Sequence, residues 1–340
     1  MKAAVYYSGE KNLKIEDWPR PEPRAGEVLV KITACGVCHT DLHYLEHGVP
    51  TFKKPPLVLG HEGAGVVTEV GQGVEGIKVG QRVLIPAVIS CGRCEYCRRG
   101  RENICVSMEM FGNNRDGCYA EYVTAPAKDV FAMPDGIPLE EGCVIADALS
   151  TPYHAVRNRG QVQAGEVVVV LGCGGVGINV VQVAAASGAI VFAVDVSDRK
   201  LQWAKDFGAA HVYNTSGREA LKELRKLTGG GGPDIVFEAI GKTATIQLAY
   251  DLVRPGGRVC VIGYTAETMP FSPAKLMYRE VSIFGSLGCR GVDYPPLIRL
   301  VERGKLDCKR LVTHRFPLDR IAEAFELMKA GESLRSVVLP

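Results

Sequence analysis

The sequence of 340 residues has almost no net charge, because 40 Lys and Arg residues are balanced by 38 Asp and Glu residues to leave +2. It therefore lacks the broad positive surface that attracts nucleic acids or anionic membranes. It also lacks an apolar segment near its beginning, where charged residues are scattered, and we expect no secretory signal. Internal repeats and low-complexity tracts are absent. Its 46% hydrophobic and 23% charged residues exclude a disordered or fibrous protein.

Glycine and cysteine are the residues that this ordinary composition leaves unexplained, with 39 and 12 copies. The chain is long enough for two domains with buried cores. We expect a cytoplasmic protein, in which thiols are reduced, so clustered cysteines indicate metal ligands or reactive groups rather than disulfides. Residues 167–194 carry no charge and are long enough to cross a membrane, but five glycines interrupt them. We therefore predict a buried strand, a glycine turn and a buried helix there, and no membrane span.

Residues 1–150 are predicted to form a β-rich domain, since short apolar runs alternate with Pro, Gly and Asp. The expected strands include EVLVKITA, AGVVTEVG, QRVLIPAV and CYAEYVTA. In PLVLGHEGAG, glycines lie on both sides of His61 and Glu62. This pattern indicates backbone that is packed closely against a neighbouring group, rather than a regular helix or strand.

Residues 151–285 show a different pattern, in which strands alternate with helical segments. The expected strands are VVVVL, IVFAVDV, DIVFEAIG, RVCVIG and VSIFGS, with helices through KLQWAKDFGA and REALKELRKL. Alternation of this kind predicts βαβ units and a doubly wound parallel sheet, hence an α/β fold class. Residues 286–340 contain an amphipathic segment, LDRIAEAFELMKAG, and the apolar end SVVLP. We assign this return segment to the first domain.

A glycine-rich loop follows the first strand of the alternating region, in VVVVLGCGGVG. Gly172, Gly174 and Gly177 have GxGxxG spacing, which permits a tight turn, close approach of backbone N–H groups to a pyrophosphate, and packing of a helix on the strand. The second strand ends in Asp195, eighteen residues after Gly177. A carboxylate there accepts ribose hydroxyls and repels a 2′-phosphate, so NAD is favoured, with NADP as the alternative because of nearby Arg199.

Four cysteines lie within fifteen residues, in CGRCEYCRRGRENIC. Four thiolates on such short loops can close a tetrahedron around Zn²⁺ and leave no position for a substrate, which predicts a structural site. The expected ligands are Cys91, Cys94, Cys97 and Cys105. The interleaved arginines, which would offset the negative charge of the cluster, are Arg93, Arg98, Arg99 and Arg101.

A second group of metal-ligand types is dispersed along the chain. It comprises Cys38 in GVCHTDLH, His61 with Glu62 in GHEGAG, and a third candidate near residue 147. Taken singly, each is also explained as a small buried cysteine or a hydrogen-bonded histidine. Only the set as a whole indicates a catalytic metal site.

Together, GVCHTDLH, GHEGAG, the four-cysteine segment, GCGGVG and the aspartate after the second strand resemble the zinc-containing medium-chain dehydrogenase/reductase family, the alcohol dehydrogenase superfamily. The resemblance runs nearly from end to end. It implies a GroES-like catalytic domain, a Rossmann domain and an active site in the cleft between them. It also implies a catalytic and a structural zinc in each subunit, reversible hydride transfer between an alcohol and NAD, and a homodimer or homotetramer.

The resemblance assigns a role to each residue of the dispersed group. Cys38 and His61 correspond to the first two zinc ligands, and Glu62 to a neighbouring carboxylate that can enter the coordination shell. Asp147 corresponds to the third ligand, where many alcohol dehydrogenases have cysteine, and Cys143 is the competing candidate. A carboxylate in place of a thiolate keeps the charge balance and makes the metal a slightly stronger Lewis acid.

The resemblance also implies a proton relay and a set of cofactor contacts. Thr40 and His43 correspond to the relay that carries the alcohol proton towards solvent, for which the titration range of histidine is suited. The implied cofactor-binding residues are Thr151, Gly172, Gly174, Gly175, Val176, Gly177, Asp195, Lys200, Ile262 and Arg335.

The substrate is less closely indicated than the chemistry. Ala87 matches a pocket position that holds a large aromatic residue in enzymes for small primary alcohols, and Tyr264 is a candidate for the opposite wall. We therefore expect secondary, branched, cyclic or aromatic alcohols and the corresponding ketones or aldehydes. The alternatives are a polyol, sugar or threonine dehydrogenase, a hydroxyacyl or enoyl thioester oxidoreductase, a zinc-free quinone or enoyl reductase, and a non-enzymatic nucleotide-binding relative.

Overall fold

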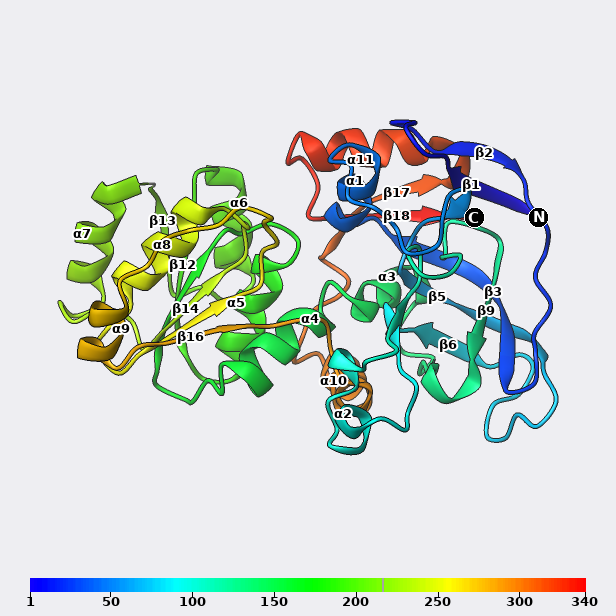
Figure 1. The fold of residues 1–340 in the computed structure, drawn as a ribbon, viewed down its shortest axis with the longest axis horizontal. Helices are drawn as coiled ribbons and strands as arrows, with labels where there is room; N and C mark the ends of the chain where they lie inside the picture. The colour runs from blue at the N-terminus through cyan, green and yellow to red at the C-terminus, as the bar shows by residue number, and fades with distance from the viewer. Residues whose placement is uncertain (216) are drawn as a thin grey trace. The chain divides into compact units, whose positions relative to one another are not determined.

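The computed structural model describes residues 1–215 and 217–340 and shows two compact units. The first unit consists of Met1–Ser150 and Gly288–Pro340, and the second of Thr151–Leu287 (Figure 1). The C-terminal residues belong to the first unit because β17 (Val312–Pro317) and β18 (Arg335–Leu339) extend its main sheet.

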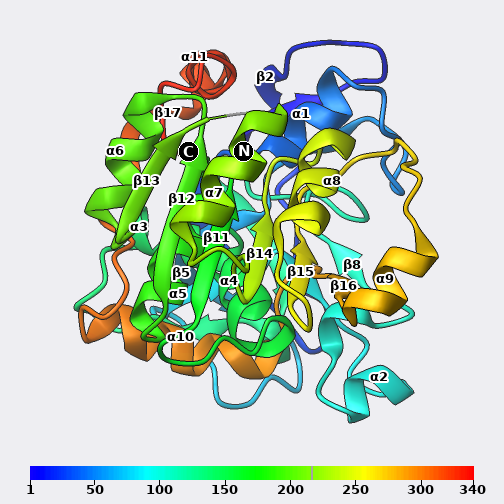
Figure 2. The same ribbon diagram turned by 90° about the vertical axis from the view of Figure 1, so that its left-hand side faces the viewer.

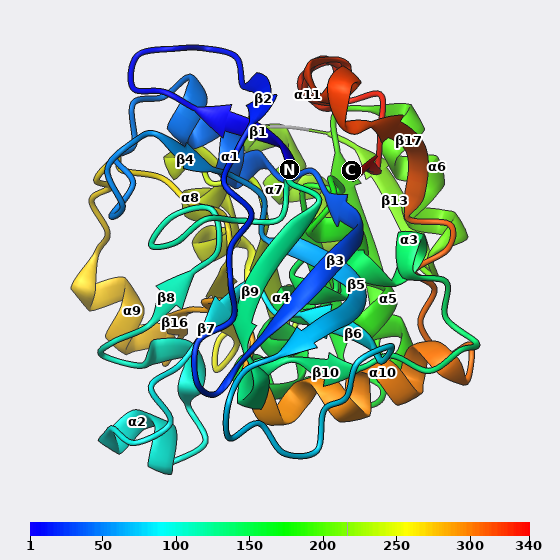
Figure 3. The same cartoon turned by 90° about the vertical axis from the view of Figure 1, so that its right-hand side faces the viewer.

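The first unit is built mainly from antiparallel strands, several of which are visible in Figure 3. Its largest sheet has the order β10-β6-β5-β3-β18-β17, and β9 also pairs with β3. The remaining strands are β1 (Lys2–Tyr6), β2 (Lys14–Asp17), β3 (Glu27–Gly36), β4 (Leu57–Val58), β5 (Glu62–Val70), β6 (Arg82–Ile85), β7 (Val88–Ile89), β8 (Glu109–Met110), β9 (Tyr122–Pro126) and β10 (Phe131–Ala132). Its helices are α1 (His39–Leu45), α2 (Glu95–Arg98), α3 (Leu139–Gly142), α10 (Tyr294–Glu302) and α11 (Ile321–Lys329).

The expectation that GHEGAG lies outside regular structure was wrong, because β5 begins at Glu62 and includes Gly63 and Gly65. The glycines are nevertheless needed for close approach. A Cβ on Gly63 would lie 2.5 Å from the sulfur of Cys118, and one on Gly65 would lie 2.1 Å from the carbonyl oxygen of Lys31. A strand interior therefore uses glycine here to let its neighbours pack against the backbone.

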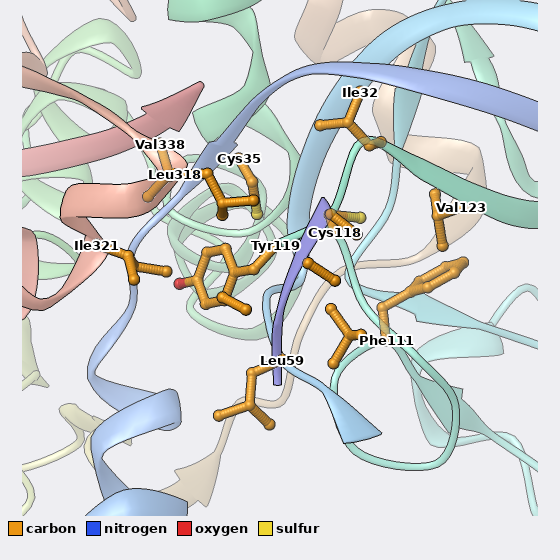
Figure 4. Close-up of a cluster of buried hydrophobic side chains, with 14 of the residues drawn as sticks. Ile32, Cys35, Leu59, Phe111, Cys118, Tyr119, Val123, Leu318, Ile321 and Val338 are labelled. Atoms are coloured by element: carbon orange, nitrogen blue, oxygen red, sulfur yellow. The ribbon is translucent and has the colours of Figure 1, made fainter. Parts of the chain in front are cut away.

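Tyr119 occupies the centre of the buried apolar cluster of the first unit, as Figure 4 shows. Its ring is fully buried and meets Phe325 of α11 edge to face, with centroids 6.3 Å apart. A buried phenol needs a hydrogen-bond partner. The Tyr119 hydroxyl donates to Asp41 Oδ2 at 2.7 Å, so the core holds this carboxylate of α1 in place.

The second unit contains a six-stranded parallel sheet with the order β13-β12-β11-β14-β15-β16 (Figure 2). The strands are β11 (Val167–Leu171), β12 (Ile190–Asp195), β13 (His211–Asn214), β14 (Ile235–Glu238), β15 (Arg258–Val261) and β16 (Ser282–Gly285). The helices are α5 (Gly177–Ala186), α6 (Asp198–Asp206), α7 (Gly217–Leu227), α8 (Thr243–Leu252) and α9 (Pro273–Arg279), while α4 (Ser150–Tyr153) begins at the boundary between the units. This strand order is that of a dinucleotide-binding doubly wound sheet.

The charge-free stretch predicted to be a strand, turn and helix forms β11, the glycine loop and α5. No helix among the described residues is long and apolar enough to cross a membrane. In the sheet, the strand order reverses between β11 and β14, and ligands of such sheets bind at the carboxyl ends of the strands beside this point. The loop after β11 and the end of β12 lie at that edge.

Candidate metal and dinucleotide sites

Four side chains of the first unit form a compact group of possible metal ligands, namely Cys38, His61, Glu62 and Asp147. One donor atom from each lies within 4.8 Å of all the others. The Oδ2 atom of Asp147 is 4.0 Å from the Cys38 sulfur and 3.7 Å from His61 Nε2. Cys38 immediately precedes α1, His61 precedes β5, and Asp147 follows a short 3-10 turn, so folding assembles the group from three segments.

The chemistry of this group fits a divalent cation. His61 and Glu62 are almost completely buried, yet both ring nitrogens of His61 and the Oε2 atom of Glu62 lack a hydrogen-bond partner among the described residues. Burial alone would lower the pKa of His61, but the charges of Asp41 and Cys38 outweigh it and hold the pKa well above its usual range. Buried polar atoms without partners are costly, and nitrogen, sulfur and oxygen donors of this kind bind zinc.

Asp41 contacts the ring of His61 on the side away from Asp147, and it was not predicted as a functional residue. Its Oδ1 atom lies 3.5 Å from His61 Nδ1, while His61 Nε2 faces Asp147. A carboxylate behind a ligating histidine orients the ring and raises its basicity. The signal in the sequence was an aspartate three residues after Cys38, in a helix whose position only the fold reveals.

Glu62 is also paired with Arg335, at 2.7 Å between Oε1 and the guanidinium. Both side chains are at most 5% exposed, and Arg335 also donates to the carbonyl of Val37 at 3.2 Å. Burial raises the pKa of Glu62 to about 7, although the charge of Arg335 opposes this shift. The arginine therefore acts first as the counter-charge of a buried carboxylate, and its contact with a cofactor pyrophosphate stays a prediction.

Cys143, the competing third ligand, lies outside the group of four. Its buried thiol donates to the carbonyl oxygen of Glu140 at 3.5 Å. Burial also raises the pKa of the Cys143 thiol well above its usual range, which favours the neutral form. The geometry therefore favours Asp147, whose carboxylate is the donor near Cys38 and His61.

The four clustered cysteines form a second possible metal site. The sulfur of Cys94 lies 3.5 Å from that of Cys97 and 3.8 Å from that of Cys105, while the sulfurs of Cys91 and Cys97 are 3.9 Å apart. A zinc tetrathiolate has sulfur–sulfur edges of about 3.8 Å, since Zn–S bonds are about 2.3 Å long. Backbone N–H groups lower the pKa of Cys94 to about 6, which favours the thiolate that binds metal.

The predicted relay residues lie on α1. Thr40 and His43 are three positions apart, a spacing that puts both on one face of a helix. His43 is half-buried, and burial, followed by the charge of His47, lowers its pKa. Its Nδ1 atom lies 2.9 Å from His47 Nδ1.

The glycine loop of the second unit has the features that a bound dinucleotide requires. Gly172 has a φ of 91°, and a Cβ on Gly177 would lie 1.7 Å from the carbonyl oxygen of Gly172, so the turn and the start of α5 both need glycine. A Cβ on Gly174 would meet nothing within 4 Å. The backbone at Gly174 is thus open to a ligand, as expected for the pyrophosphate-binding position.

Asp195 ends β12 beside this loop. Its Oδ2 atom accepts from the backbone N–H of Cys173 at 2.8 Å, and its Oδ1 atom accepts from those of Val196 and Ser197 at 2.8 and 3.0 Å. A carboxylate has about four acceptor positions, so capacity for a ribose hydroxyl remains. The three bonds hold the side chain at the carboxyl edge of the sheet.

The other predicted cofactor residues are distributed over the second unit. Thr151 is buried on α4, Lys200 lies on α6, and Ile262 directly follows β15. Gly175 and Val176 lead into α5, as expected. The two pocket candidates belong to different units, with Ala87 buried in the first and Tyr264 59% exposed in the second, so their shared pocket stays a prediction.

A parallel sheet with a dinucleotide loop, joined to a unit that presents zinc-type donors, defines a zinc-binding nucleotide-dependent oxidoreductase. Residues 24–135 match the alcohol dehydrogenase GroES-like domain, and residues 175–303 match the zinc-binding dehydrogenase family. An alcohol dehydrogenase of Geobacillus stearothermophilus is 40% identical over 340 residues, covering 100% of this chain and 98% of the relative. A sorbitol dehydrogenase of Bacillus subtilis (strain 168) is 34% identical over 347 residues, covering 100% and 97%.

Solved structures show the same likeness. The crystal structure of an NAD-dependent alcohol dehydrogenase has a TM-score of 0.92 and 35% identity, with 100% of both chains covered. A zinc-binding dehydrogenase of Sinorhizobium meliloti 1021, solved with NADP, has a TM-score of 0.89 and 31% identity, covering 100% of this chain and 99% of the other. The chain belongs to the zinc-containing medium-chain dehydrogenase/reductase family and is an oxidoreductase.

Proposed function

We propose that the protein is a zinc-dependent alcohol dehydrogenase that uses NAD and prefers secondary, branched, cyclic or aromatic alcohols. The observation that carries this proposal is the group of Cys38, His61 and Asp147, with Glu62 beside it, whose donor atoms converge within 4.8 Å of one another. In this group, both ring nitrogens of His61 and Oε2 of Glu62 are buried without a hydrogen-bond partner among the described residues. Three protein ligands leave a fourth position open, which is the arrangement of a catalytic zinc rather than a structural one.

The residues of this group and those of α1 have different roles in the proposed reaction. Cys38 as a thiolate, neutral His61 and ionised Asp147 together balance the charge of a zinc ion. When bound, the metal polarises the substrate oxygen and makes the alcohol a stronger acid. Thr40 and His43, on the same face of α1, take up the proton and pass it towards solvent. The four-cysteine site holds a structural zinc with no open position.

Removing the charge of Asp195 is expected to change the choice of cofactor. In Asp195→Asn, the ribose hydroxyl of NAD loses a charged hydrogen-bond acceptor. Since hydrogen bonds to charged groups are strong, we expect kcat/KM with NAD to fall about ten- to a hundredfold. The value with NADP should fall much less, because repulsion of its 2′-phosphate is relieved. Kinetics with both cofactors give the ratio.

Asp195 also accepts the N–H of Cys173, so thermal unfolding of the variant must be measured in parallel. A lower Tm with an unchanged NAD to NADP ratio would show that the side chain supports the loop and does not select the cofactor.

Metal analysis combined with a substrate panel tests the proposed function as a whole. We expect two zinc equivalents per chain, one for each donor group, and faster NAD-linked oxidation of cyclic or secondary alcohols than of ethanol. Sorbitol and threonine belong in the panel because polyol and amino-alcohol dehydrogenases are the alternatives in this family. One zinc, or none, with reduction of quinones would contradict the proposal.

The substrate preference rests on Ala87, and one substitution probes it. Ala87→Phe in the same panel should shift preference towards ethanol, since in related enzymes for small primary alcohols a large aromatic residue at the matching position narrows the substrate pocket. A strong ethanol preference in the parent enzyme would count against the expected substrate class.

We also propose that the cytoplasmic enzyme is a homodimer or homotetramer. Strand β16 is at the edge of the parallel sheet, and Ile283 on it is exposed. On α9, Met277 and Tyr278 are 67% and 85% exposed, so this region presents apolar side chains that association would cover. Sedimentation of the purified protein gives the stoichiometry.

A further inference from the structure

His43 has a partner that the relay of Thr40 and His43 does not include. Its Nδ1 atom lies 2.9 Å from Nδ1 of His47, with the two rings tilted by 50° and their centroids 5.1 Å apart. This is a hydrogen-bond distance, so one imidazole donates to the other. His43 is half-buried and His47 is exposed, which makes the pair a step from the interior to the surface.

The local backbone explains why His47 lies against His43. Helix α1 ends at Leu45, and the N–H of Glu46 still bonds to the carbonyl of Leu42 at 2.8 Å. The chain then reverses through Gly48, whose φ is 66°, and the N–H of Val49 bonds to the carbonyl of His43 at 3.1 Å. A left-handed glycine and two backbone hydrogen bonds thus fold the segment after α1 back over its last turn.

Charged groups of both signs lie near the pair. Glu46 pairs with Lys329 of α11 at 2.8 Å, and the charges of Lys329, His47 and Lys11 all act on Glu46. His47 itself is exposed, so a proton that reaches its ring can pass directly to water.

We propose that His47 is the terminal group of the proton relay, accepting the proton from His43 and delivering it to solvent. The inference rests on the proposed function, since it extends the relay of Thr40 and His43. His43 receives a proton at Nε2 because Nδ1 is engaged by His47. The Nδ1 proton of the resulting imidazolium passes to Nδ1 of His47, and His47 releases its Nε2 proton to water, so one proton enters the pair and one leaves.

Substitution by glutamine separates proton transfer from hydrogen bonding, because glutamine keeps a polar side chain that does not titrate. In His47→Gln at low buffer concentration we expect kcat for alcohol oxidation to fall on the order of tenfold, since water replaces the lost acceptor. Added imidazole should restore the rate. The matched control is His211→Gln, an exposed histidine on β13 of the second unit, which should behave as the parent at every buffer concentration.

A second measurement needs neither metal nor cofactor. NMR titration of the histidine rings in the parent should show His43 and His47 titrating as a coupled pair, identified by their loss in the His43→Gln and His47→Gln variants. In His47→Gln, the pKa of His43 should rise, because the neighbouring charge that lowers it is gone.

The outcomes separate this inference from the proposed function. An active parent with His47→Gln unchanged at low buffer, or a His43 titration unaffected by the substitution, overturns the role of His47 alone. A zinc-loaded parent that oxidises no alcohol with NAD overturns the proposed function and the relay with it. A loss that imidazole does not restore shows that His47 is structural, which also overturns the inference.

Discussion

Replacing His61 with alanine is expected to abolish alcohol turnover while leaving NAD binding intact. His61 is buried between Asp41 and Asp147, and its loss removes the nitrogen donor of the four-residue group. A metal that polarises the substrate supplies several kcal/mol, so we expect a fall in kcat of at least about a thousandfold. Cys38→Ala should give the same result. Kinetics, zinc content and NAD titration together provide the measurement.

The pattern of metal content makes this prediction specific. Each variant should keep the zinc of the four-cysteine site and lose only the other, so that the content falls from two equivalents to one. His211→Ala, at an exposed histidine of the second unit, serves as the matched control and should retain both. Full activity in His61→Ala or Cys38→Ala would contradict the assignment of the catalytic site.

Replacing Arg335 with methionine should destabilise the first unit strongly. The substitution keeps most of the apolar volume but leaves Glu62, which is fully buried, without its counter-charge at 2.7 Å. Breaking a buried ion pair by removing one partner costs about 3–5 kcal/mol, mostly because the remaining charge is left in a poorly solvating interior. Urea unfolding of the metal-free protein measures the loss.

Two further variants show whether the buried charge is the cause. Adding Glu62→Gln to Arg335→Met should recover a large part of the lost stability, because no unpaired charge remains. Arg320→Met removes an arginine whose partner Glu323 is exposed, and it should leave the unfolding midpoint almost unchanged. If Arg335→Met were as stable as the parent but bound NAD poorly, the arginine would act on the cofactor alone.

Local sequence patterns were enough to predict the second unit in outline. Five of its six strands contain the apolar runs that were predicted, while β13, with the sequence HVYN, was missed because it has no such run. The turn after β11 needs Gly172 and Gly177 because any side chain there would clash or strain the backbone. These requirements act within a few residues of one another. The confirmed parallel sheet and glycine loop follow directly from them.

Patterns were less informative in the first unit, where short elements depend on their surroundings. Helix α10 has prolines at its second and third positions and was not predicted, although proline is compatible with the first turn of a helix. Strand β5 was predicted from Ala64 onwards, but its first two residues, Glu62 and Gly63, were assigned to irregular backbone because of the flanking glycines. In each case the element is stabilised by packing partners that lie far away in the sequence.

The amino-acid sequence by itself determined the family and the fold class, because the motifs occur together in the order and spacing of the family. Through that resemblance it gave the candidate ligands Cys38 and His61, with Asp147 or Cys143 as the third. Only the tertiary structure showed which other side chains contact the ligands and the relay residue. Asp41 faces His61, Arg335 neutralises Glu62, and His47 folds back onto His43. The first two contacts depend on where separate segments meet in space, which packing decides and no spacing along the sequence encodes. The third is local, and it depends on the chain reversal at Gly48 after the end of α1.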